Sequence, residues 1–415
     1  MEKFYNIDPK TCSKEELTEA IKHCKIIEKQ SDTKQLATKL FINSVYGAMA
    51  NQYYYNSNVE MAESVTLQGQ DLIKYSTNEV NAYFKNIWSD DTATHKKIAE
   101  YMKSKFPEFN VEEFLENAKR NISFNKTLQV YGDTDSSYIT LQPVIDSCNI
   151  PHDQETEFVL ALNECILADY LNSRFDAYAV SFNCPTNVQK FELEKIARSV
   201  VMLAKKKYVM DISWKEPDVH VPSQHAIVYK GIEVIQGSTP NFCRDEMKEF
   251  IKYVLKEIDD HGIPQFDGVV NKLKELKVKF SMQNPNEICK SFGMSDYEKY
   301  VYNDKPDTGV IYNDGITTPI HVRAAATYNN MLYNKAKRYK SKYKIIHKGD
   351  KVKFYYVTDT DVFAFLPNEF PVEFAPKMDI DLQFEKMVLE PLNRIIEACG
   401  YSKVSSSLTY SKGLW

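Results

Sequence analysis

Residues 128–141 have the sequence Leu-Gln-Val-Tyr-Gly-Asp-Thr-Asp-Ser-Ser-Tyr-Ile-Thr-Leu. Apolar and aromatic residues on both sides of a Gly-Asp-Thr-Asp-Ser core predict two strands joined by a tight turn. At the tip of this hairpin Asp133 and Asp135 lie close together, and two like charges so placed repel each other unless a cation joins them. Mg²⁺ prefers oxygen ligands, and a pair of such ions serves phosphoryl transfer. The turn therefore predicts a metal site.

A plain surface turn is the alternative, because Gly, Asp and Ser are common turn residues. A bare Asp-x-Asp pattern favours that alternative. The full Tyr-Gly-Asp-Thr-Asp-Ser run, with apolar strands on both sides, favours the metal site.

Upstream, residues 13–50 predict a long helix that begins with a capping box formed by Ser13 and Glu16. Lys39, Asn43 and Tyr46 lie on one face of this helix by the spacing of side chains along a helix. Lysine offers a point charge to phosphate oxygens, and asparagine adds a hydrogen-bond donor. The alternative is an ordinary solvated helix face.

These two segments, in this order, resemble a known family. The pattern K-x-x-x-N-S-x-Y-G at Lys39–Gly47, followed by Y-G-D-T-D-S at Tyr131–Ser136, is similar to motifs B and C of family B DNA polymerases. Further stretches resemble the palm and thumb of this family. The last two stretches below, from the thumb, resemble the form found in T-even-like bacteriophages. They are Phe191–Lys195, Ala204–Tyr208, Lys230–Glu233, Ser238–Pro240, His321–Arg323 and Thr327–Asn329.

The resemblance implies an α+β fold: an incomplete family B palm of antiparallel sheet and helices, a fingers helix, and a mixed helical and β thumb. It implies a second fingers helix with motif B in residues 1–58 and a palm with motif C in 59–240. Residues 89–126 are an inserted, charged helical excursion rather than core, and 241–415 are the thumb and C-terminal tail. Helices are expected at 59–88, 154–180 and 244–260, and strands at 188–194, 207–213 and 226–235.

The resemblance also implies site residues. Asp133 and Asp135 are the catalytic metal ligands, with two Mg²⁺ ions expected in the complete site. Lys39 and Asn43 hold the dNTP, and Tyr46 checks the minor groove of the nascent base pair. The residues expected to contact the primer or the DNA are Ser136, Glu194, Lys205, Lys206, Tyr208 and Arg323. Lys207 replaces the arginine usual in the family, so a two-point phosphate contact becomes a one-point contact.

One element of the family pattern is missing. Motif A, D-x-x-S-L-Y-P, carries the other essential aspartate, and no stretch of the 415 residues matches it. Asp211-Ile-Ser-Trp is the nearest decoy, and the exonuclease carboxylates are absent too. The expectation is a split polymerase whose N-terminal subunit brings motif A and the exonuclease. Without that subunit the chain is expected to be inactive.

A cluster of basic residues and tyrosines in the expected thumb predicts salt-sensitive contact with the DNA backbone, the alternative being a solubilising surface. Its basic members are Lys335, Lys337, Arg338, Lys340, Lys342, Lys344, Lys348 and Lys351. At the C-terminus, Leu414 and Trp415 are candidates for docking on a sliding clamp, and a disordered end is the equal alternative.

Composition sets the remaining limits. The chain is 43% hydrophobic and 26% charged with a net charge of −5, which is typical of globular proteins and does not exclude a local basic groove. Its eight cysteines contain no C-x-x-C pair, and no apolar run is long enough for a membrane span. A cytoplasmic location is expected, in the host cell if a phage encodes the chain.

Two other functions remain open from sequence. The first is a non-catalytic DNA-binding or processivity module that keeps the polymerase fold. The second is an unrelated carboxylate-pair hydrolase, in which the Lys39–Asn43 face has no task.

Overall fold

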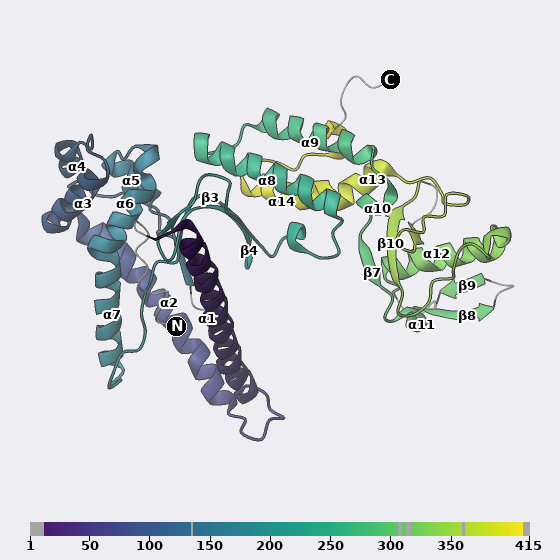
Figure 1. Ribbon diagram of the computed structural model, residues 1–415, viewed down its shortest axis with the longest axis horizontal. Coiled ribbons are helices and arrows are strands. Elements are labelled where there is room, and N and C mark those ends of the chain that lie inside the picture. The colour runs from purple at the N-terminus through teal and green to yellow at the C-terminus, as the bar shows by residue number, and fades with distance from the viewer. Residues whose placement is uncertain (1–11, 134–135, 306–308, 313–316, 359–361, 410–415) are drawn as a thin grey trace. The chain divides into compact units, whose positions relative to one another are not determined.

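The computed structural model describes residues 12–133, 136–305, 309–312, 317–358 and 362–409. Long helices and small antiparallel sheets make it an α+β protein, as predicted. The chain divides into two compact units, Met1–Phe191 and Glu192–Trp415 (Figure 1). The expected boundaries after residues 58 and 240 differ from this division. The assignment of fingers, palm and thumb to the three expected parts stays a prediction.

A helical hairpin begins the first unit. Helix α1 (Lys14–Met49) starts at Ser13, whose hydroxyl accepts a hydrogen bond from the Glu16 amide at 3.2 Å while the Glu16 carboxylate accepts one from the Ser13 amide at 2.9 Å. The predicted capping box is therefore confirmed. Helix α2 (Val59–Asn86) starts at Asn58, whose side chain accepts from the Met61 amide at 2.9 Å.

Short helices pack around the far end of α2. The α-helices are α3 (Thr92–Lys105), α4 (Val111–Asn117), α5 (Gln142–Cys148), α6 (Glu155–Leu162) and α7 (Ala168–Ser181). Two 3₁₀ turns, η2 (Trp88–Asp90) and η3 (His152–Gln154), and one π-helical turn, η4 (Asn163–Leu167), connect them.

The expectation that residues 89–126 lie outside the core is wrong. Ile98, Met102 and Phe114 from this segment are fully or almost fully buried, and they belong to one cluster with Trp88 and Phe158. The charged residues between them occupy the outer faces of α3 and α4, and they masked the apolar spacing in the sequence. The segment is part of a helical subdomain and contributes to the core of the first unit.

The predicted metal hairpin is confirmed as a hairpin. Strands β1 (Gln129–Asp133) and β2 (Ser136–Ile139) pair antiparallel, with Asp133 opposite Ser136 and Tyr131 opposite Tyr138. The two residues between these strands lie outside the described part of the chain.

An antiparallel sheet begins the second unit. Strand β4 (Lys207–Lys215) pairs with β3 (Lys195–Ala204) on one side and with β5 (Val219–His220) and β6 (Ile227–Lys230) on the other. The strand predicted at 207–213 is confirmed. The strand predicted at 226–235 ends at Lys230, because Gly231 has a positive φ of 64° and Glu233–Ile235 form the 3₁₀ turn η5.

The strand predicted at 188–194 is wrong. No strand covers these described residues, and β3 begins only at Lys195. The Phe191 amide donates instead to the Asn172 side chain of α7 at 2.7 Å, and the Asn172 amide donates to the Phe191 carbonyl at 3.3 Å. A side chain therefore satisfies the backbone groups that a strand partner would otherwise have bonded.

Helices cover this sheet in the second unit. Helix α8 (Asn241–His261) buries Met247, Phe250, Ile251 and Val254, at the spacing of one helical face, and packs on β3. The other helices of this layer are α9 (Phe266–Ser281), α10 (Pro285–Ile288), α13 (Ile380–Phe384), the π-helical turn η7 (Glu385–Leu389) and α14 (Glu390–Ala398).

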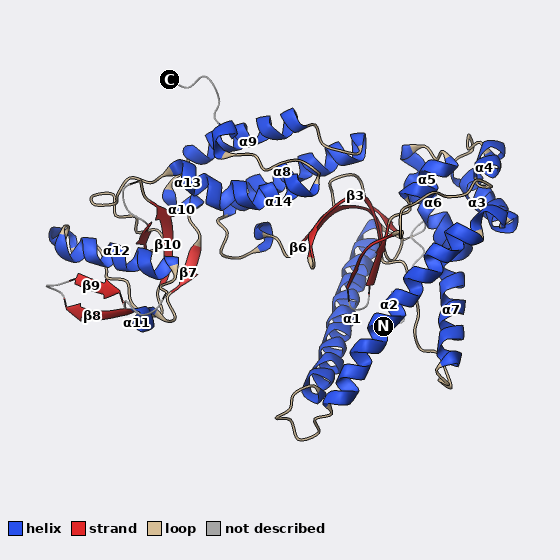
Figure 2. Cartoon of the chain, turned by 180° about the vertical axis from the view of Figure 1, so that it is seen from behind, coloured by secondary structure: helices blue, strands red, loops and turns tan. Residues whose placement is uncertain are grey.

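A second, three-stranded sheet follows, with β10 (Lys351–Tyr356) between β7 (Ser291–Gly293) and β11 (Val362–Phe365). Helix α12 (Ile320–Asn334) packs on β11 and β10, and Figures 1 and 2 show it beside β10. The remaining elements are α11 (Tyr297–Tyr300), β8 (Val301–Lys305), β9 (Gly309–Tyr312), η6 (Lys337–Tyr339) and η8 (Ser406–Thr409). Among the described helices, none is both long and apolar enough to cross a membrane.

Candidate functional site

The β1–β2 turn holds the acidic pair predicted to bind metal. Asp133 is the last residue of β1 and faces Ser136, whose hydroxyl donates to the Asp133 carbonyl at 3.4 Å. Only two residues separate the strands, so the turn is tight. Asp135 lies in that gap, outside the described residues, and its placement relative to Asp133 stays a prediction.

A glycine and a glutamine shape this hairpin. A Cβ on Gly132 would lie 2.9 Å from Gln129 Nε2 and 3.5 Å from a methyl carbon of Ile73 in α2. Gln129 Nε2 also donates to Ser137 Oγ across the hairpin at 3.0 Å. A Cβ on Gly132 would displace the Gln129 amide, which ties the two strands together. Gln129 and Ile73 could not be predicted from the sequence, because neither belongs to a motif.

Helix α2 also holds the base of the hairpin. The Asn81 side chain accepts from the Leu128 amide at 2.9 Å and donates to Thr127 Oγ1 at 3.0 Å. Leu128 itself is fully buried. The start of β1 is thus anchored in the core of the first unit.

The predicted nucleotide helix meets the same face of α2. The hydroxyl of Tyr46 in α1 forms a 2.5 Å hydrogen bond with Thr66 Oγ1 in α2. Thr66 and Ile73 are seven residues apart, so they lie on one face of α2, about 10 Å apart along its axis. Tyr46 and the β1–β2 hairpin therefore approach the same face of α2, about two helical turns apart.

Lys39 and Asn43 lie on the exposed surface of α1. Helices α1 and α2 are consecutive and antiparallel, so Lys39, seven residues before Tyr46, lies at roughly the level of Ile73 along the hairpin. Ile73 is the residue that approaches Gly132.

The donor atoms of the hairpin suit a hard cation. Residues 129–139 carry carboxyl, hydroxyl and amide side chains and contain neither histidine nor cysteine. Such oxygen donors favour Mg²⁺ over zinc or copper. Within the described ranges no group of three or more His, Cys, Asp or Glu residues is arranged to hold an ion.

A second charged turn joins β3 and β4 in the other unit. Lys205 and Lys206 form its exposed tip, and Lys206 has a positive φ of 62°. A Cβ on Gly231 would lie only 2.2 Å from the Lys206 carbonyl oxygen. Gly231 therefore lets β6 press against the backbone of the turn. Tyr208 is almost fully buried in β4, opposite Lys230.

The other predicted DNA contacts are dispersed within this unit. Glu194 precedes β3, forms a 3.5 Å ion pair with Lys195, and so lies at the end of the strand opposite to the Lys205–Lys206 turn. Arg323 is half-buried in the first turn of α12. The structure does not gather Glu194 with the two lysines.

Asp211, the decoy for motif A, has a structural role. Its side chain is buried in β4 and accepts hydrogen bonds from the Gln224 amide at 2.9 Å and from Ser223 Oγ at 3.3 Å. Gln224 has a positive φ of 63°. The carboxylate thus stabilises a loop and is not available as a metal ligand.

The basic cluster of the second unit lies between α12 and β10, and all eight of its lysine and arginine side chains are exposed. Lys342 pairs with Glu373, and Lys348 pairs with Glu298 at 3.4 Å. The hydrogen bonds from Lys342 and Tyr343 lower the pKa of the Glu373 carboxyl to about 2. Two members of the cluster are therefore already paired with carboxylates. The proposed clamp-docking residues Leu414 and Trp415 lie outside the described part.

Comparison with known proteins gives a family match. The model for DNA polymerase family B matches residues 10–361. The DNA-directed DNA polymerase of Enterobacteria phage T4 is 24% identical over 336 residues, which are 75% of this chain and 30% of that protein.

Two further relatives agree with this match. The DNA-directed DNA polymerase of Escherichia phage RB69 is 21% identical over 78% of this chain and 32% of its own length. The DNA polymerase of Choristoneura biennis entomopoxvirus is 26% identical over 63% and 25%. The chain spans less than a third of the length of these relatives.

Proposed function

Because the chain belongs to DNA polymerase family B, we propose that it is the polymerase module of a DNA-directed DNA polymerase. It binds primer–template DNA and a dNTP and contributes part of the nucleotidyl-transfer site. The proposal rests mainly on the approach of Tyr46 to Thr66 and of Gly132, next to Asp133, to Ile73, since Thr66 and Ile73 share one face of α2. A nucleotide-binding helix and a metal-binding turn must meet in this way for transfer to occur.

In this proposal Asp133 and Asp135 hold Mg²⁺, with two ions in the complete site. The bound ions activate the attacking 3′-hydroxyl and neutralise the triphosphate charge. The oxygen-rich hairpin supports this assignment. Mg²⁺ in such sites is held by few carboxylates together with substrate phosphates, so a small acidic cluster is adequate.

Lys39 and Asn43 contact the triphosphate in this scheme. Lys39 places one positive charge near its oxygens, and Asn43 adds a directed amide donor. Tyr46, already oriented by Thr66, presents its ring to the nascent base pair. Ser136, Glu194, Lys205, Lys206, Tyr208 and Arg323 are the proposed primer and DNA contacts.

We also propose that a third carboxylate comes from a polypeptide outside these 415 residues, an N-terminal subunit that carries motif A and the exonuclease. The surface of α1 supports this. Large apolar side chains occupy most of the helix circumference outside the Lys39–Asn43 face, and all are exposed: Leu36, Leu40, Phe41, Ile42 and Val45. An exposed apolar surface of this kind is typical of an interface, so we expect another chain segment to cover it.

Primer extension tests the proposal. The chain, assembled with an N-terminal polypeptide that contains D-x-x-S-L-Y-P, should extend a labelled primer with Mg²⁺, and the chain alone should not. Asp133→Asn and Asp135→Asn should each lower the rate at least about 10²-fold in the assembly. Asp146→Asn, on the exposed side of α5, is the matched control and should leave the rate unchanged.

The outcomes separate the alternatives. Extension by the chain alone contradicts the external carboxylate. If the assembly binds primer–template but does not extend the primer at any Mg²⁺ concentration, the chain is a non-catalytic DNA-binding or processivity module. Equal rates for the two Asp variants and the control contradict the metal assignment itself.

A further inference from the structure

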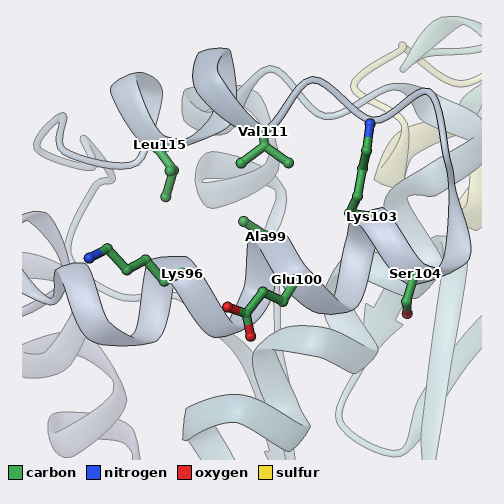
Figure 3. A pocket seen from close by; sticks show the side chains of 7 residues that line it. All are labelled: Lys96, Ala99, Glu100, Lys103, Ser104, Val111 and Leu115. Carbon is green, nitrogen blue, oxygen red and sulfur yellow. The ribbon is translucent and has the colours of Figure 1, made fainter.

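The helical subdomain of the first unit contains an open groove of about 430 Å³ between α3 and α4. Ala99 from α3 and Val111 and Leu115 from α4 form its apolar wall, and Lys96 and Lys103 line its two ends. Figure 3 shows Val111 and Leu115 pointing across the groove toward α3. Its volume lies in the range of sites that bind ligands.

Two of the three charged residues that line this groove are basic: Lys96 and Lys103, with Glu100 as the acidic one. Lys96 and Lys103 are exposed and are two helical turns apart, about 10 Å along α3. Figure 3 shows Lys96 extending past one end and Lys103 rising at the other, whereas Glu100 and Ser104 point away from Val111 and Leu115. Lys103 Nζ donates to the Phe109 carbonyl at 3.2 Å, which fixes its position over the groove.

The groove is built on a rigid base. Ile98 and Met102 of α3 and Phe114 of α4 are buried directly behind the lining residues, in the cluster that contains Trp88. A preformed site loses little conformational entropy when a ligand binds. A short segment can therefore bind it without a large ordering cost.

We propose that this groove is a docking site for a partner-protein segment in which an apolar side chain is flanked by acidic residues. In an extended segment of pattern acidic-x-apolar-x-acidic the three side chains share one face, and the two carboxylates are about 13 Å apart. The flexible lysine stems at the ends of the groove reach such a span. The apolar side chain fills the space between Ala99, Val111 and Leu115.

The charge pattern favours a protein segment over a nucleic acid. Nucleic-acid binding depends on a run of cations that neutralise successive phosphates. Here two cations are separated by an apolar wall, and Glu112 and Glu116 extend along the exposed surface of α4. The docking site is independent of the polymerase activity, so either proposal can fail without the other.

Fluorescence polarisation with the full chain tests the docking site. The probe is a fluorescein-labelled peptide with the core Asp-Ser-Phe-Ser-Asp, at an ionic strength of about 0.05 M to limit screening. We expect a Kd of about 100 µM, typical of a short motif with one anchor. Lys96→Glu combined with Lys103→Glu should weaken binding at least tenfold, and so should Leu115→Gln.

Matched controls define the outcomes. Lys119→Glu removes an exposed lysine of the same subdomain outside the groove lining and should leave the Kd unchanged. The fluorescence of Trp88 and far-ultraviolet circular dichroism identify any variant that fails to fold, and for such a variant Lys96→Ala combined with Lys103→Ala is measured instead. Equal binding of a Lys-Ser-Phe-Ser-Lys peptide, or no binding below about 5 mM, overturns the proposal. A labelled 12-nucleotide single strand that binds tighter than the peptide and loses affinity in the lysine variants assigns the groove to nucleic acid instead.

Discussion

Two long helices of this chain, α1 and α8, differ in how much of their apolar surface the chain itself covers. Phe250 of α8 is 3% exposed within the core of its unit, whereas Phe41 of α1 is 71% exposed. Both helices have strong local signals, yet only α8 has a sheet packed against its apolar face. The second unit therefore covers the apolar face of α8 with its own sheet, whereas the apolar side chains of α1 stay exposed, as the proposed partner requires.

The two charged turns repeat this contrast. The Lys205–Lys206 turn is held by direct backbone contact, because the Lys206 carbonyl lies against Gly231. At Gly132, in the strand that leads to Asp133, the atoms nearest to an added Cβ are instead the ends of side chains, the Gln129 amide and a methyl group of Ile73. An added Cβ would therefore meet fixed backbone at Gly231 and movable side-chain atoms at Gly132.

The largest expected effect separates the two helices. Phe250→Ala should lower the free energy of unfolding by about 3–5 kcal/mol, because it leaves a cavity in the core. Phe41→Ala, the matched exposed substitution, should change it by less than about 0.5 kcal/mol. Urea denaturation of the chain alone measures both. If Phe41→Ala destabilises the isolated chain as strongly as Phe250→Ala, α1 is already covered and the comparison fails.

The next largest effect concerns the turns. Gly231→Ala should cost about 1–3 kcal/mol or more, because a Cβ at a positive φ would meet the fixed Lys206 carbonyl. Gly132→Ala should cost less than about 1 kcal/mol, because the Gln129 amide can move aside. Gly237→Ala is the control, since a Cβ there meets nothing within 4 Å. Equal costs at Gly132 and Gly231 in urea denaturation would show that both turns are equally rigid.

Sequence reasoning succeeded where the cause is local. Ser13 and Glu16 determine the start of α1, and the Gly-Asp-Thr-Asp-Ser run determines the hairpin, through contacts within a few residues. The family followed from two short motifs in order, and the match over residues 10–361 confirms it. The roles of the site residues stay predictions.

The remaining features depend on contacts distant in sequence. The hydrogen bond between Tyr46 and Thr66 spans a helical hairpin and leaves no periodic pattern. Asn172 replaces a strand partner for Phe191, which made the predicted strand at 188–194 wrong. The core of α3 and α4 was hidden because charged residues fill the outward positions between its buried side chains.

A smaller, pH-dependent effect tests whether the core of the first unit excludes water and protons as well as the core of the second unit does. Burial lowers the pKa of His95 below its usual value of 6.5. The nearby Asp91 carboxylate raises this pKa in part, and the positive charge of Lys119 lowers it further. The unfolded state therefore binds the proton more tightly, and stability should fall as the pH drops below about 6.5. Trp88, whose ring lies 4.5 Å from that of His95, reports unfolding by fluorescence in a Trp214→Phe, Trp415→Phe background.

The His95→Gln variant should show a flatter dependence of the unfolding midpoint between pH 7 and pH 5. An unchanged slope in His95→Gln would mean that the buried site admits water or a proton without cost. The core of the first unit would then be less closed than its burial indicates.

The smallest expected effect tests how α1 stays helical without a cover. Of the described α1 residues only Ala20 is buried, so local interactions rather than packing must hold most of the helix. Ser13→Ala removes one side of the capping box and should cost about 0.5–1 kcal/mol, confined to the first turns. Hydrogen exchange should become faster for amides near Glu16 and stay unchanged in α8. Thr18→Ala is the control, since its hydroxyl bonds only to the Lys14 carbonyl within the same helix. If Ser13→Ala leaves exchange in the first turns unchanged, contacts beyond the cap already hold the helix, and α1 resembles α8 more closely than its exposure indicates.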